Sequence, residues 1–103
     1  MRIVTKVGTG ILAHGGDRLS RPHMIELVRQ LAHLHDQGHE ILLVTSGAVL
    51  AGREVLGTLR QRRDIPFKQM LAAVGQGRLM AIYEQLFSMY NINIAQALLT
   101  RAD

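Results

Sequence analysis

The sequence contains no cysteine and no tryptophan, and only 4% of its residues are aromatic. Without cysteine, the chain can form neither disulfides nor cysteine-rich metal sites, and thiolate catalysis is excluded. Nucleic-acid binders usually combine a basic stripe with interleaved aromatic side chains. Here the basic residues are scattered, apart from the short run 60–63, so we expect no nucleic-acid partner despite a net charge of +4.

The sequence also has no apolar run long enough to cross a membrane. Its first residues, Met1 to Val4, lack the apolar core of a signal peptide. We therefore expect a soluble, cytoplasmic protein with no membrane partner. A length of 103 residues, 48% of them hydrophobic, is enough for one small domain with a buried core.

The apolar pattern predicts an α/β fold with the element order β-α-β-α-α-β. Strands are predicted at 2–7, 41–44 and 92–99, and helices from about 20 to 37, 48 to 56 and 67 to 90. Residues 8–18 and 57–66 are predicted to be loops. Helical crossovers between the strands imply a parallel sheet, in a three-layer αβα arrangement with helices on both faces.

Two glycine-containing turns, 8–10 and 46–48, follow the first two predicted strands. In open parallel sheets, ligands bind at the carboxyl ends of the strands, so both turns should lie at the same edge. Their backbone amides, the Ser46 hydroxyl and the Lys6 ammonium together suit an anion, especially a phosphoryl group. The alternative is that Lys6 simply extends to solvent from an edge strand.

Two nucleotide-binding motifs were compared with these turns. The P-loop pattern does not occur in the sequence. Residues 8–13 fit a loose form of the dinucleotide fingerprint, but this motif should open directly into a helix, which residues 14–17 are expected to break. The second strand also ends without the acidic residue that binds the ribose. A dinucleotide-binding domain is therefore the weaker alternative.

Histidines and helical glycines provide two further signals. The four-residue spacing of His35 and His39 can hold a metal, but histidines near a helix C-terminus also complement its dipole, so we expect no metal site. Gly75 and Gly77 lie inside the long predicted helix and cost about 1 kcal/mol each relative to alanine. Close packing of another helix or subunit would explain them. A non-catalytic association or regulatory module is thus a second alternative.

Four segments of the sequence, "VTKVGTGIL", "VTSGAVLAGRE", "KQMLAAVGQGRL" and "EQLFSMYNINIAQALLTRAD", resemble the glutamate 5-kinases (gamma-glutamyl kinases) of the amino acid kinase superfamily. They occur in the family's order and cover essentially the whole chain. The resemblance implies transfer of the ATP γ-phosphoryl group to the side-chain carboxylate of L-glutamate, the first step of proline biosynthesis. It also implies Mg²⁺ with ATP, feedback inhibition by proline and, for the complete enzymes, a homo-oligomer.

The resemblance further implies a role for each matched residue. Lys6 matches the catalytic lysine that contacts the ATP phosphates, and the adjoining loop residues are Gly8, Thr9 and Gly10. Glutamate binding is implied for the second turn, at Ser46, Gly47 and Ala48. Thr5 stands where the family usually has an aliphatic residue. Gly10 stands where serine or threonine is commoner, which removes a hydroxyl donor but keeps the backbone amide.

The kinase domain of this family is longer than the present chain. Residues 1–103 therefore resemble its N-terminal part, without the rest of the domain or the C-terminal PUA domain that many members carry. The family's adenine-binding half and its further glutamate-binding residues fall outside these positions. We accordingly expect the chain by itself to be inactive.

Overall fold

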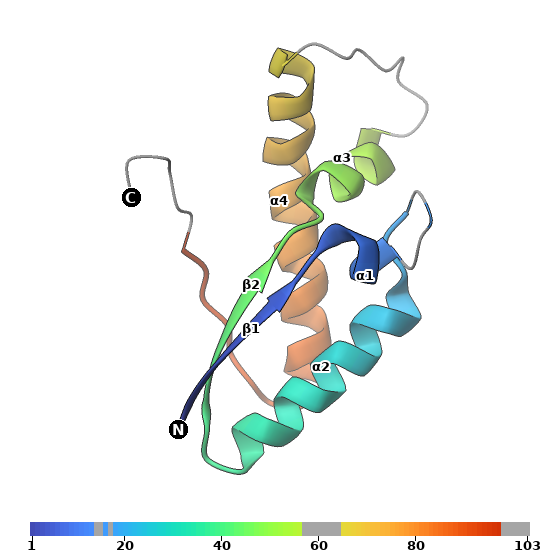
Figure 1. The fold of residues 1–103 in the computed structure, drawn as a ribbon. Coiled ribbons are helices and arrows are strands. Elements are labelled where there is room, and N and C mark those ends of the chain that lie inside the picture. Colours follow the sequence, from blue (N-terminus) through green and yellow to red (C-terminus); the bar gives the residue numbers. More distant parts are fainter. Residues whose placement is uncertain (14–15, 17, 57–64, 98–103) are drawn as a thin grey trace.

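The computed structural model describes residues 1–13, 16, 18–56 and 65–97 as a two-stranded sheet with helices (Figure 1). In chain order the elements are β1 (Arg2–Val7), α1 (Thr9–Ala13), α2 (Arg21–Asp36), β2 (Glu40–Thr45), α3 (Ala48–Leu56) and α4 (Ile65–Ser88). The predicted α/β class is confirmed. Within the described ranges, no helix combines the length and apolar character that spanning a bilayer requires.

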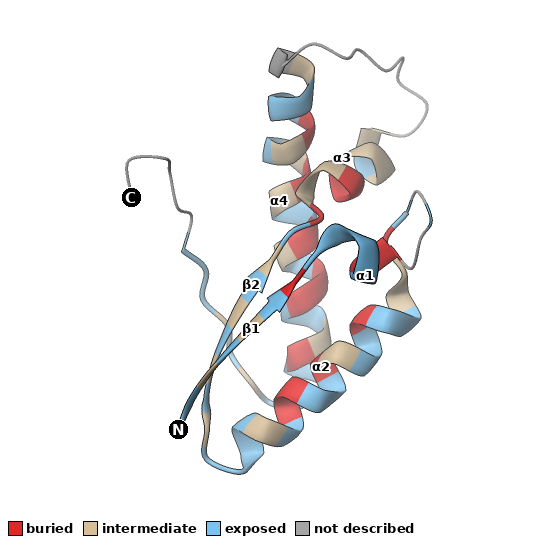
Figure 2. Ribbon diagram, in the orientation of Figure 1, coloured by how far each residue is buried: buried red, intermediate tan, exposed pale blue. Residues whose placement is uncertain are grey.

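The sheet is parallel, as predicted, with Ile3 opposite Ile41 and Val7 opposite Thr45. The crossover between its strands is made by α2. The strands alternate between an inner face that is half-buried, with Val7 buried, and an exposed outer face, and α2 and α4 lie on the inner side (Figures 1 and 2). The described residues therefore form two layers of the expected three, and the outer face of the sheet is open to solvent.

The core lies between the inner face of the sheet and the two long helices. Its α2 side chains follow helical spacing as predicted, and its α4 side chains recur at steps of three or four residues: Met24, Val28, Leu31, Leu71, Leu79, Ile82, Tyr83 and Phe87. The apolar spacing of the predicted helix 67–90 indicates six inward-facing residues: Met70, Leu71, Val74, Ile82, Leu86 and Met89. This prediction is partly wrong, because Met70 and Met89 are exposed. The buried face of α4 includes Gly75. A prediction based on hydrophobic residues ignores glycine, and for this reason it misplaced the buried face.

Two other predictions differ from the structure. Residues 8–18 were expected to be a loop, but α1 forms because Leu12 and Ala13 become buried and the Leu12 amide donates to the Gly8 carbonyl at 3.3 Å. The predicted strand at 92–99 is not a strand over 92–97, and its last two residues lie outside the described ranges. That segment has no neighbouring strand to complete a ladder, and instead Ile92 and Ile94 pack against the core.

Helices α3 and α4 cross in direct backbone contact at two glycines. A Cβ built on Gly75 would lie 1.6 Å from the Ala48 carbonyl oxygen, and one on Gly52 would lie 2.0 Å from the Leu71 carbonyl oxygen. The expected close packing at Gly75 is therefore confirmed, and the partner is a helix of the same chain. Gly77 has open space around it, so close packing within the described residues does not explain it.

Candidate functional site

The two glycine turns meet at the carboxyl edge of the sheet. Thr9 follows β1 and Ser46 follows β2, and their hydroxyl oxygens are hydrogen-bonded at 2.8 Å. The Ser46 amide also donates to the Val7 carbonyl at 3.2 Å, which continues the pairing of the strands into the turn. Parallel topology thus places a predicted phosphate-binding residue beside a predicted glutamate-binding residue.

A cleft of about 390 Å³ opens beside this hydrogen bond. Four predicted site residues line it together with five that were not predicted: Thr9, Ser46, Gly47 and Ala48, then Thr45, Val49, Leu50, Arg53 and Gln76. Gly8, just before α1, and Gly10, within α1, are exposed and do not line the cleft. The structure therefore brings residues of the predicted phosphate-binding turn and of the predicted glutamate-binding turn into one cavity.

Lys6 lies on the outer, solvent-exposed face of β1, opposite Val44 in the register. It is two residues before Gly8 and does not line the cleft. Among the described residues, it takes part in no hydrogen bond or ion pair. For a lysine that serves phosphates, the strand is expected to restrict the ammonium and give it a fixed target. The described residues do not restrict it in this way, because the face of the sheet that carries Lys6 is uncovered.

Gly47 fixes the backbone between Ser46 and α3. Its φ of +107° lies in the region that side chains disfavour. A Cβ at this position would also lie 3.2 Å from Leu12 Cδ1 and 3.3 Å from Leu19 Cδ2. The Gly47 carbonyl then accepts the Ala51 amide at 2.9 Å, which begins the hydrogen bonding of α3. Glycine is needed here for both conformation and space.

A chain of hydroxyls connects the core to the second turn. Thr45 Oγ1 donates to the Ser46 carbonyl at 3.1 Å and lies 2.9 Å from the Tyr83 hydroxyl. Because the Thr45 proton is used in the first bond, the Tyr83 hydroxyl donates in the second. Tyr83 is only 1% exposed. The buried ring thus holds the turn through an oriented hydrogen bond.

This arrangement predicts the titration of Tyr83. Burial raises the pKa of its phenol above the ordinary 10.0, although the hydrogen bond with Thr45 opposes the shift. Because the folded chain favours the neutral phenol, this contribution to stability is complete below the ordinary value and is lost as the pH rises through the raised one. The chain has two tyrosines, so the tyrosinate absorbance of the wild type minus that of Tyr83→Phe isolates this group.

In the same comparison, we expect Tyr83→Phe to lower the free energy of unfolding by about 1 kcal/mol near neutral pH, the usual net value of one hydrogen bond. It should also abolish the loss of stability at alkaline pH that is specific to Tyr83. A difference titration centred at or below the ordinary tyrosine value would contradict the burial of this phenol.

The far wall of the cleft comes from α3 and α4. Gln76 follows the Gly75 crossing, and its Nε2 donates to Gln96 Oε1 at 3.2 Å. The segment after α4 therefore contacts a residue of the cleft wall even though it is not a strand. Val49 and Arg53 lie four residues apart on α3, so they share the helix face that lines the cavity.

From sequence alone, two consecutive charged residues, Arg53 and Glu54, are expected on the solvated face of a helix. This expectation is wrong for Arg53, which is half-buried in the cleft wall. The signal that could have found it is helical spacing counted from the turn. Because this helix starts at Ala48, directly after Gly47, its second turn lies near the carboxyl edge of the sheet, where ligands bind.

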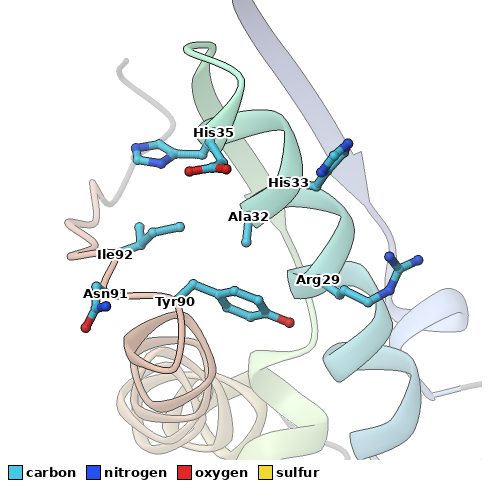
Figure 3. A pocket seen from close by; sticks show the side chains of 8 residues that line it. Arg29, Ala32, His33, His35, Tyr90, Asn91 and Ile92 are labelled. Atoms are coloured by element: carbon cyan, nitrogen blue, oxygen red, sulfur yellow. The ribbon is translucent and has the colours of Figure 1, made fainter.

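A second pocket, of about 540 Å³, lies between the end of α2 and the turn after α4 (Figure 3). Tyr90 and Ile92 extend toward α2 across it. Arg29, on its wall, is bound to Glu26, and the hydrogen bonds from Arg29 and Gln30 lower the pKa of the Glu26 carboxyl to about 2. This pocket adjoins the start of β2, so it is at the opposite end of the sheet from the glycine turns.

The histidines near the end of α2 do not assemble a recognisable metal centre within the described residues. Groups of three or more potential ligands among His, Cys, Asp and Glu do not occur there. His33 Nε2 lies 3.3 Å from Gln37 Nε2, and His33 and His35 occupy the last turn of α2. His14 lies outside the described residues.

Comparison with known proteins gives a consistent result. A profile described as the amino acid kinase family matches residues 1–103. A glutamate 5-kinase of Herpetosiphon aurantiacus is 61% identical over 103 residues, which is 100% of this chain and 28% of that protein. Glutamate 5-kinases of Klebsiella pneumoniae and Salmonella newport are 56% and 57% identical over 101 residues, or 98% of this chain and 28% of each relative. The chain thus spans little more than a quarter of the length of these curated relatives.

Proposed function

Because this chain belongs to the amino acid kinase family, we propose that it supplies the carboxyl-edge binding site of a kinase that phosphorylates the side-chain carboxylate of L-glutamate, with ATP as donor. The observation that carries the proposal is the hydrogen bond between Thr9 and Ser46, which unites the two turns. In this proposal Lys6, Gly8, Thr9 and Gly10 serve the phosphates. Ser46, Gly47 and Ala48 serve glutamate.

The chemistry needs little from the protein beyond positioning and charge. A side-chain carboxylate is already ionised at neutral pH, so its oxygen can bond to the γ-phosphorus without a general base while the bond to the ADP oxygen breaks. The described cleft wall contains no histidine or carboxylate. Its hydroxyls and amides, together with Arg53 in the wall and Lys6 nearby, can hold two anions together and offset their repulsion.

Magnesium does not fit as a resident ion of this cleft. Protein Mg²⁺ sites use one or two carboxylates together with substrate phosphates, and the described lining offers only hydroxyl and amide groups. We therefore assign the ion to the ATP phosphates and derive no step from it. The same proposal includes glutamyl 5-phosphate for proline biosynthesis, proline as a feedback inhibitor, a homo-oligomeric enzyme and a cytoplasmic location.

The two alternatives gain less support. The association module was based on the helix with Gly75 and Gly77 and on exposed strands; Gly75 is covered by α3 of the same chain, whereas Gly77 has open space around it. The dinucleotide fingerprint, residues 8–13, itself contains the five-residue helix α1, which ends at Ala13 and is too short to be the helix that the motif should open into. The second strand ends at Thr45 without an acidic residue.

The function can be tested with a chimera in which this chain replaces the matching N-terminal portion of the Herpetosiphon relative. We expect hydroxamate formation from hydroxylamine that requires both ATP and L-glutamate, because an activated acyl phosphate is trapped. The unmodified relative is the positive control, and the 103-residue chain alone should give no turnover. A folded chimera that is inactive, or that prefers another acceptor, would refute the proposal.

A further inference from the structure

We infer that Arg53 binds the second carboxylate of the acidic amino acid, the one that is not phosphorylated, and so selects substrates that carry two carboxylates. The inference rests on the proposed function. It concerns a residue of α3 that the sequence comparison with the family left without a role. It starts from the charge of the cleft.

Arg53 is the only charged side chain among the described residues that line the cleft. The rest of the wall consists of hydroxyls, one amide, glycine and aliphatic groups. A cavity with one cation and no acidic counterpart favours an anionic ligand. Lys6, the other nearby cation, lies outside this cavity on the outer face of β1.

The guanidinium has unused bonding capacity. Arg53 Nε is buried and has no hydrogen-bond partner within the described part of the chain. The neighbouring acid, Glu54, is already paired with Arg21, at 3.5 Å. Adjacent helical residues also point in different directions, so Glu54 is poorly placed to neutralise Arg53. The buried Nε anchors the guanidinium in the cleft wall, and because no acidic side chain among the described lining residues opposes its charge, a carboxylate in the cleft can pair with the accessible part of the group.

The position of Arg53 fits a ligand with two anionic ends. The first end belongs at the Thr9–Ser46 hydrogen bond, where the turns meet. Arg53 follows Ala48 by five residues, or about 7.5 Å along the helix axis at ~1.5 Å per residue. The planar guanidinium can bind a carboxylate through two parallel hydrogen bonds, which Lys at this position could not reproduce.

The test compares L-glutamate with 4-aminobutyrate, which lacks the α-carboxylate, by following the amide NMR signals of Ser46 and Gly47 in the 103-residue chain. We expect the wild type to bind glutamate more tightly by roughly ten- to a hundredfold. Arg53→Met should remove most of this preference and leave 4-aminobutyrate binding unchanged. Arg53→Lys should restore only part of it, and Arg78→Met, an exposed arginine of α4, should match the wild type.

Each other outcome has a defined meaning. If the wild type shows no response to glutamate, this inference fails, whereas the proposed function is judged separately by the activity of the chimera. If glutamate binds but Arg53→Met weakens both ligands equally, or neither, only the inference is overturned. If Arg53→Met lost the binding of inorganic phosphate but kept the binding of glutamate, the inference would also be overturned, because the anion that Arg53 binds would then be a phosphate. Should Arg53→Met not fold, equal wild-type affinities for the two ligands would overturn the inference.

Discussion

Replacing Gly75 with alanine is expected to lower the free energy of unfolding by about 3 kcal/mol or more, which is at or beyond the upper end of the usual cost of overpacking. The new methyl group would lie 1.6 Å from the Ala48 carbonyl oxygen and 2.4 Å from the Gly52 nitrogen. Both are backbone atoms, so no rotamer change can relieve the clash. The two helices would have to separate, and the cleft wall formed by α3 would move with them.

Gly77→Ala is the matched control, since it lies two residues further along the same helix with open space around it. There, alanine should be neutral or stabilise the chain by up to about 1 kcal/mol through its helix propensity. Urea unfolding followed by circular dichroism measures both variants. Equal stabilities for the two variants would show that the close helix crossing at Gly75 does not exist in solution.

Replacing Lys6 with methionine is expected to lower the turnover number of the chimera by about a hundredfold or more, the usual cost of removing one donor that stabilises transition-state charge. Methionine keeps the length and much of the apolar stem but removes the ammonium. The stability of the chain should barely change, because Lys6 is exposed and forms no ion pair within the described residues. The loss should therefore appear in catalysis and not in folding.

Lys68→Met provides the control, because Lys68 is the other lysine of the chain and is exposed on α4. Its turnover should equal that of the unmodified chimera. Lys6→Arg should recover little activity, since the planar guanidinium group of arginine does not reproduce the compact ammonium group of lysine. A Lys6→Met chimera with turnover within about threefold of the parent would exclude the lysine from the chemistry.

The parts of the site that could be predicted follow from local rules. Apolar runs that end in glycine define where β1 and β2 stop, and parallel pairing then requires Gly8 and Ser46 to lie at one edge. The Thr9–Ser46 hydrogen bond is a direct consequence of that topology. No knowledge of helix packing was needed for this result.

The parts that could not be predicted depend on tertiary approach. Arg53 and Gln76 reach the cleft only because Gly52 and Gly75 let α3 and α4 come into backbone contact. A glycine inside a helix indicates close packing but does not identify the partner. The segment after α4 failed as a strand for a similar reason, since a strand exists only when a neighbour completes its hydrogen bonds.

The solvent-exposed outer face of the sheet affects the electrostatic field of the Lys6 ammonium. Val4, Leu42 and Val44 are 61%, 53% and 45% exposed beside Lys6, although parallel strands are normally covered on both faces. With water of high dielectric constant at this surface, the field of the ammonium at a nearby phosphate is strongly screened. A layer of polypeptide over these three side chains would exclude that water and strengthen the attraction several-fold. In the proposed kinase, the strength of the interaction between Lys6 and a phosphate would therefore depend on what covers this face of the sheet.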